Sequence, residues 1–154
     1  MSQAQTKAEI QPKSIDEMIE IVIADYAKFP EAQTYAIYAE DVYFKDPVYE
    51  FRGLKQYQKM IGFITKWFAN LNLALHTIEE VETSQSNPTE GVTTIKTEWT
   101  MSWNSPMPWK PRISVDGWSE LGINHQGQII SHVDYWHCTK WDVVKQHIPF
   151  LSNS

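Results

Sequence analysis

Residues 54–71 read LKQYQKMIGFITKWFANL, and their apolar side chains give the clearest structural signal in the chain. These side chains recur every three or four residues, as one face of an α-helix requires; they are Leu54, Tyr57, Ile61, Ile64, Phe68 and Leu71. The stretch therefore predicts a helix over 54–71. Most of the chain after it has the pattern of strands, which we predict at 73–83, 92–104, 112–123 and 128–137.

The segment before this helix predicts a second one. Ser14 and Glu17 have the capping-box spacing, and an apolar stripe at helical spacing follows as far as Tyr26, before Pro30 ends the helix. A shorter helix is predicted over 31–39, and a brief strand over 42–46 stops at Pro47. Hairpin-turn residues occupy 84–91 and 124–127, and residues 141–151 predict a short closing helix.

Helices followed by strands are typical of an α+β fold rather than of a parallel α/β sheet. We predict a strongly curved antiparallel sheet wrapped around the N-terminal helices, which leaves a cone-shaped cavity open at one end. A length of 154 residues suits one domain. We therefore expect a flexible tail over 1–13 and a single domain over 14–154.

The composition argues against several partners. The net charge is −6, and the two arginines, Arg52 and Arg112, are not clustered, so a nucleic-acid partner is not expected. No apolar run approaches the roughly 20 residues that cross a bilayer, and the polar start of the chain lacks a signal peptide. The single cysteine, Cys138, cannot form an internal disulfide and fits a reducing compartment. We predict a cytoplasmic protein with neither a nucleic-acid nor a membrane partner.

Two local motifs, in this order of elements, resemble the SnoaL-like and ketosteroid-isomerase-like proteins of the nuclear transport factor 2 superfamily. The first motif is YAEDVYFKDPV over 38–48, followed by Arg52-Gly53 and the long helix, and the second is GQIISHVDYW over 127–136. The resemblance covers roughly residues 14 to 138 and implies the cone-shaped fold. More narrowly, MPWKPRI over 107–113 resembles a signature of an uncharacterised family from photosynthetic organisms.

The last predicted strand carries the candidate site. Its alternation places Ile130, His132, Asp134 and Trp136 on one face, which the resemblance implies is the cavity face. The resemblance also matches Asp46 to the proton-shuttling base of the ketosteroid isomerases. Because burial among aromatic rings raises the pKa of a carboxyl group, such a group becomes a useful base. We predict catalytic residues Asp46, His132 and Asp134, and ligand-contacting residues Trp136, Phe44, Ile130 and Ser119.

Each catalytic candidate also has a structural interpretation. An Asp before proline commonly caps its own turn, and a lone histidine is commonly a satisfied, half-buried side chain. Asp134 needs a partner if it is buried, and Arg112, Lys140 or a backbone donor would suffice. Tyr26 and Trp67 are expected in the core. The Trp99, Met101 and Trp103 run is expected in the core or at a dimer contact rather than in a ligand cage.

One departure from the resembled isomerases affects the predicted chemistry. Their oxyanion hole uses a helix Tyr and a protonated Asp. The corresponding positions here fall near Ile21 or Val22 and near Ser119, so ketosteroid isomerisation is not predicted. No phosphate-binding loop, dinucleotide fingerprint or zinc spacing is present in the sequence, and we expect neither a cofactor nor a metal.

Three functions fit these observations. We favour a small-molecule-binding domain, whose aromatic cavity holds an apolar or aromatic ligand. The first alternative is a cofactor-independent enzyme of isomerase, cyclase or hydrolase type, with Asp46 or Asp134 as general base. The second is a dimeric interaction or scaffold domain whose own side chains fill the cavity. Seven tryptophans and seven tyrosines leave rings over for an interface, so we expect a homodimer, which sedimentation at several concentrations would test.

Overall fold

The computed structural model describes residues 13–81 and 92–149. The predicted turn over 84–91, nearly all of the predicted tail and the last two residues of the predicted closing helix lie outside these ranges. Within them, no helix is long and apolar enough to cross a membrane.

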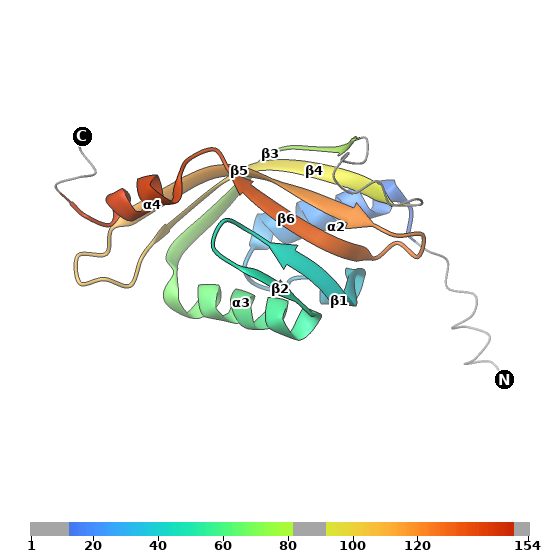
Figure 1. The fold of residues 1–154 in the computed structure, drawn as a ribbon, viewed down its shortest axis with the longest axis horizontal. Coiled ribbons are helices and arrows are strands. Elements are labelled where there is room, and N and C mark those ends of the chain that lie inside the picture. The colour runs from blue at the N-terminus through green and yellow to red at the C-terminus, as the bar shows by residue number, and fades with distance from the viewer. Residues whose placement is uncertain (1–12, 82–91, 150–154) are drawn as a thin grey trace.

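The described chain confirms the α+β class, because helices pack on a curved sheet (Figure 1). Its elements in chain order are α2 (Ile15–Lys28), a 3₁₀ turn (Tyr35–Ile37), β1 (Tyr38–Lys45), β2 (Glu50–Arg52), α3 (Leu54–Trp67), β3 (Ala69–Val81), β4 (Thr93–Asn104), β5 (Arg112–Ile123), β6 (Ile129–Trp136) and α4 (Lys140–Gln146). The strands form one sheet in the order β2-β1-β6-β5-β4-β3. In the described ranges β1 and β6 pair in parallel, and the other neighbours pair antiparallel.

The first helix begins where the capping box predicts. The Glu17 backbone N–H donates to Ser14 Oγ, and the Ser14 N–H donates to the Glu17 carboxylate, each over 3.1 Å. Met18 and Val22 of this helix are buried against the sheet. Ile23, which the apolar stripe includes, is instead 43% exposed.

The predicted helix over 54–71 is too long by one turn, since α3 ends at Trp67 and β3 begins at Ala69. Phe68 leaves helical geometry, with φ −95° and ψ 113°. Its ring stacks on Trp103 of β4 with the centroids 4.6 Å apart. Asn70 then adopts a left-handed conformation, with φ 51°, which asparagine tolerates better than most residues. A tertiary contact therefore overrides the helical periodicity.

The predicted helix over 31–39 is wrong, because only Tyr35–Ile37 form a helical turn and Tyr38 already belongs to β1. The buried Asp25 at the end of α2 explains the difference. Its carboxylate accepts hydrogen bonds from the Thr34 N–H over 3.0 Å and from the Thr34 hydroxyl over 2.8 Å. The Gln33 side chain donates to the Asp25 carbonyl over 2.9 Å. These bonds hold the segment as a connection against the helix end.

A β-bulge in β6 changes the predicted strand alternation. Ile123 pairs with Ile129, but Gly122 pairs with Ser131, so Ile130 is an extra residue. The bulge turns Ile129 into the core, where it is fully buried. The prediction that Ile130 shares the face of His132 is therefore wrong, because a one-residue shift moves side chains to the opposite face.

Gly117 of β5 provides a test of how closely the inner face is packed. A Cβ there would collide with the Tyr135 carbonyl oxygen and lie 2.8 Å from the Trp99 ring. We expect Gly117→Ala to lower the free energy of unfolding by about 1–3 kcal/mol. The control is Gly62→Ala in α3, where a Cβ meets nothing within 4 Å. That change is expected to raise the free energy of unfolding by about 0.5–1 kcal/mol. Urea unfolding of both variants measures the contrast, and effects of the same sign would contradict it.

Candidate acid–base and ligand-binding site

A row of polar side chains crosses the inner face of the sheet, the face that α2 and α3 cover. Thr97 of β4 pairs with Ser119 of β5, and Ser119 pairs with Asp134 of β6. Thr97 and Ser119 are almost fully buried. Next to this row, Leu121 pairs with His132 on one side and Gly117 pairs with Trp136 on the other. The register of the three strands thus brings these polar groups together inside an otherwise apolar interior.

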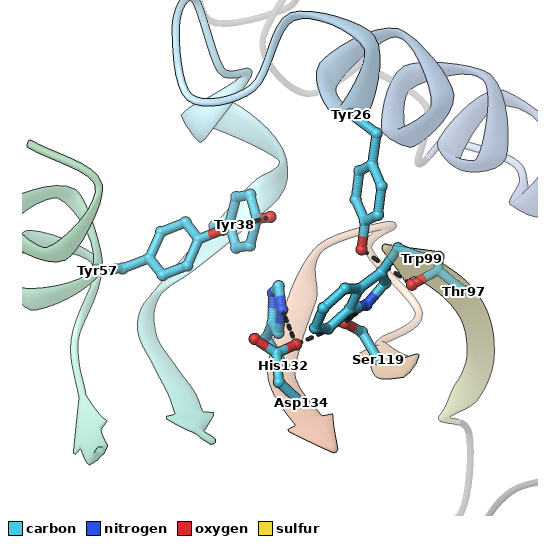
Figure 2. Close-up of polar contacts among 8 residues, drawn as sticks. All are labelled: Tyr26, Tyr38, Tyr57, Thr97, Trp99, Ser119, His132 and Asp134. Atoms are coloured by element: carbon cyan, nitrogen blue, oxygen red, sulfur yellow. Dashed lines mark hydrogen bonds and ion pairs between the residues drawn. The ribbon is translucent and has the colours of Figure 1, made fainter. Parts of the chain in front are cut away.

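Trp99, Ser119, Asp134 and His132 form a continuous hydrogen-bond network on this face (Figure 2). Trp99 Nε1 donates to Ser119 Oγ over 2.9 Å, and the Ser119 hydroxyl donates to Asp134 Oδ1 over 2.5 Å. His132 Nε2 lies 2.7 Å from the same carboxylate oxygen. Asp134 therefore has two side-chain partners, which a largely buried carboxylate requires. They are not the expected Arg112 or Lys140, since Arg112 binds Ser102, Asn104 and the Asn70 carbonyl.

The second ring nitrogen of His132 is left without a partner. When Nε2 donates to the Asp134 carboxylate, Nδ1 of the neutral ring is an acceptor. Nδ1 is the one buried side-chain nitrogen or oxygen without a hydrogen bond in the part of the chain that the structure describes. The ring packs between Phe44 and Tyr57, with centroids 5.1 and 5.8 Å away. An unmade hydrogen bond at such a position costs about 1–3 kcal/mol.

An inner cavity of about 120 Å³ borders this network. Six of the predicted site residues line it, namely Phe44, Asp46, Ser119, His132, Asp134 and Trp136. Ile130 is not among the lining residues, as its place in the bulge explains. The predicted catalytic residues therefore face one common cavity.

Three tyrosines also face this cavity, and sequence analysis did not identify them as site residues. Tyr26 Oη lies 2.9 Å from Thr97 Oγ1, and the hydroxyls of Tyr38 and Tyr57 lie 3.3 Å apart. Figure 2 shows the three hydroxyls directed toward the space around His132 and Asp134. Burial raises the pKa of Tyr26 to about 12, and it also raises the pKa values of Tyr38 and Tyr57 above the usual tyrosine value. All three hydroxyls remain protonated at neutral pH. Tyr26 was assigned to the core on helical periodicity, which carries no information about where a hydroxyl points.

Asp46 combines the two roles that the sequence left open. Its Oδ1 accepts hydrogen bonds from the backbone N–H groups of Val48 and Tyr49, over 2.7 and 2.5 Å, so it caps its own turn. It also lines the inner cavity. Burial raises the pKa of Asp46 most, and the Asp134 charge adds to the rise, whereas the two N–H groups and His132 lower it. The carboxyl group is thus electrostatically linked to the His132–Asp134 pair.

A larger, outer cavity of about 470 Å³ lies beside the inner one. The two cavities share part of their lining, which consists of Asp46, Met60, Ile64, Met101 and Trp136. Val48, Tyr49 and Phe63, each more than half exposed, border the outer cavity where it meets the surface. Trp99 and Trp103 belong to the core as expected and also wall these cavities.

The chemistry of the lining does not suggest a metal site. Over residues 13–81 and 92–149, no group of three or more His, Cys, Asp or Glu side chains is placed to hold a metal ion. The polar side chains that line the inner cavity carry hydroxyl, imidazole, carboxyl and amide groups, the amide being that of Gln33.

Comparison with protein families gives one match. The model of a family described as uncharacterized conserved protein (DUF2358) matches residues 16–132. No curated protein matches the chain.

Comparison with solved structures places the fold. An NTF2-like protein of unknown function from Exiguobacterium sp. 255-15 has a TM-score of 0.59 and 14% identity, covering 82% of this chain and all of its own. A protein with a ketosteroid isomerase-like fold from Catenulispora acidiphila, solved with trimethylamine, has a TM-score of 0.59 and 14% identity, covering 86% of this chain and 93% of its own. The epoxide hydrolase/cyclase-like enzyme SalBIII, described in pyran ring formation in salinomycin, has a TM-score of 0.63 and 14% identity, covering 79% and 91%. These likenesses confirm the predicted NTF2-like fold.

Two substitutions of Asp46 separate the stability that comes from its turn hydrogen bonds from the effect of its ionisation. Asp46→Asn keeps an Oδ1 that accepts both backbone N–H bonds, whereas Asp46→Ala leaves them unmade and is expected to cost about 1–2 kcal/mol of unfolding free energy. Because the folded-state pKa of Asp46 is raised, its contribution to stability is present at low pH and is lost as the pH rises through that pKa. The Asn variant should therefore gain stability relative to the wild type between acidic and neutral pH. Urea titrations across that range measure it, and a constant difference would contradict the raised pKa.

Proposed function

The chain belongs to the family described as uncharacterized conserved protein (DUF2358), and we propose that its function is to bind a small, mostly apolar molecule through a hydroxyl group. The observation that carries this proposal is the buried His132 Nδ1, which has no hydrogen-bond partner within the described residues. A ligand hydroxyl that donates to Nδ1 would remove the cost of burying that acceptor alone.

The shape and lining of the inner cavity support the same ligand class. Its volume, about 120 Å³, approaches that of an engineered cavity of about 150 Å³ that binds benzene. A single ring or a short branched chain is therefore of suitable size. Aromatic and aliphatic side chains supply most of the wall, and Phe44, Trp99 and Trp136 are among them. This is the usual composition of a small-molecule site, in which a few polar groups set the orientation.

The names of the structural neighbours agree with a small-molecule site. One was solved with trimethylamine, and another is an epoxide hydrolase/cyclase-like enzyme. The shared fold therefore accommodates small organic molecules in other proteins. The choice of a hydroxyl-bearing ligand rests on His132 in this chain.

The probe pair p-cresol and p-xylene tests the proposed function, because the two molecules differ by a hydroxyl in place of a methyl group. We expect the wild-type protein to bind p-cresol about three- to tenfold more tightly, since one net hydrogen bond contributes about 0.5–1.5 kcal/mol. His132→Phe should remove that preference and still bind p-xylene. Calorimetric or NMR titration measures both affinities. Equal affinities for the wild type, or an unchanged preference in the variant, would refute the proposal.

The His132–Asp134 pair favours a second candidate, a cofactor-independent acid–base enzyme. Asp134 fixes the proton on Nε2 and would stabilise the imidazolium that forms when Nδ1 accepts a proton. In this candidate the base is His132 rather than Asp46 or Asp134. The Oδ1 of Asp46 is occupied by its turn, and the Oδ1 of Asp134 is occupied by Ser119 and His132. The three protonated tyrosines could donate to the oxygen of an enolate.

Deuterium exchange at the α-carbon of phenylacetone in D₂O tests this second candidate. Nδ1 would take the carbon-bound proton, and the resulting imidazolium would exchange with solvent and return deuterium. Asp134→Asn keeps an acceptor for Ser119 and His132 but removes the charge, so exchange should slow by about a hundredfold or more. Binding of p-cresol should change little. NMR follows the exchange. If the wild-type protein exchanges deuterium no faster than free imidazole does, the enzyme candidate is refuted and only the binding function is left.

Two expectations from the sequence stay predictions. Homodimerisation and a cytoplasmic location are tested neither by the fold nor by the cavity.

A further inference from the structure

The outer cavity has a polar rim and an apolar interior. It lies between α3, the turn after β1, and the β4 residues Met101 and Trp103. Asp46, Gln56 and Lys59 are its acidic, amide and basic side chains, and aliphatic and aromatic residues make up most of the other eleven of the fourteen that line it. At about 470 Å³ it falls in the size range of sites that enclose a whole small molecule.

Helix α3 places its side chains at two depths in this cavity. Gln56, Lys59 and Phe63 follow each other at helical spacing and are exposed, so they form the rim. Met60 and Ile64 lie one position further round the helix, are half-buried and border both cavities. The side of the outer cavity away from the rim is therefore a wall that it shares with the inner cavity.

Charge is distributed unequally between the rim and the inner cavity. Asp134 lines the inner cavity alone, and Asp46 lies on the wall that the two cavities share. Lys59 is the only cationic side chain that lines either cavity. It has no ion pair over residues 13–81 and 92–149, where the three pairs are Lys28–Asp25, His132–Asp134 and Lys145–Asp142. Helix α3 carries three lysines and no acidic residue in a protein of net charge −6. An anionic group is thus disfavoured toward the inner cavity and favoured at the rim.

We propose that the outer cavity binds an elongated, mostly apolar carboxylic acid, whose carboxylate pairs with Lys59 at the rim and whose chain extends toward the inner cavity. Gln56 supplies a second donor at the rim. The proposal rests on the proposed function for the far end of the ligand, where a hydroxyl donates to His132. The full ligand class is an apolar acid with a hydroxyl group at the end opposite the carboxylate.

Calorimetric titration with decanoate, decanol and ω-hydroxydecanoate tests this assignment. Lys59→Met removes the charge and keeps most of the side-chain length, and we expect it to weaken both acids about fivefold while leaving decanol unchanged. The matched control is Lys55→Met, on the same helix but outside both cavities, which should change none of the three affinities. Added salt should weaken the acids and not the alcohol.

The outcomes separate this proposal from the function on which it rests. Equal losses for decanoate and decanol in Lys59→Met, or equal losses in the Lys55→Met control, would overturn the carboxylate site alone. A preference of the wild type for decanol over decanoate would overturn it as well. If ω-hydroxydecanoate binds no better than decanoate and His132→Phe has no effect, the hydroxyl contact fails while the Lys59 site stands. Absence of binding by all three probes would overturn the carboxylate site, while the p-cresol titration still decides the hydroxyl contact with His132.

Discussion

The extra residue Ile130 in β6 determines which side chains of that strand face the cavity. If the pairing of Ile123 with Ile129 continued without a bulge, Ser119 would lie opposite Val133. With the bulge, Ser119 lies opposite Asp134, and His132 turns toward the interior. Gly122 permits this arrangement, because a Cβ there would collide with Ser131 Oγ. The hydrogen-bond network, the inner cavity and the proposed base all depend on this register.

The hydrogen-bond network offsets most of the free energy that it costs to bury the Asp134 carboxylate among aromatic rings. Asp134 accepts bonds from Ser119 and His132, and Ser119 accepts one from Trp99, so each member satisfies the next. The network ends at His132 Nδ1, the one buried side-chain nitrogen or oxygen without a hydrogen bond in the described ranges. A protein that gained only stability from this network would do better to close it. Because His132 Nδ1 has no partner in the described ranges, a hydrogen bond from a ligand to this atom is physically favourable.

The inner cavity borders His132, and the outer cavity beside it reaches the protein surface. Their shared wall includes Asp46, whose carboxylate caps a turn and whose raised pKa reflects burial near Asp134. Acidic side chains line the inner cavity, and Lys59 provides positive charge at the rim. Size, apolar walls and this polarity together define a ligand more narrowly than the fold does, because one fold hosts many functions.

Local patterns in the sequence determined the start of α2 at Ser14, the core of α3 and the strands that follow, since caps and periodicity act over a few residues. They also placed His132, Asp134 and Trp136 on one face, because that stretch lies beyond the bulge. Tertiary contacts decided the rest. Stacking of Phe68 on Trp103 shortened α3, Asp25 held the following segment out of a helix, and the bulge moved Ile130 off the inner face. The tyrosine hydroxyls and the inner cavity lie where α2, α3 and the sheet meet, and the outer cavity lies where α3, the turn after β1 and α4 meet the sheet. Distances between such remote segments are not encoded in any local pattern.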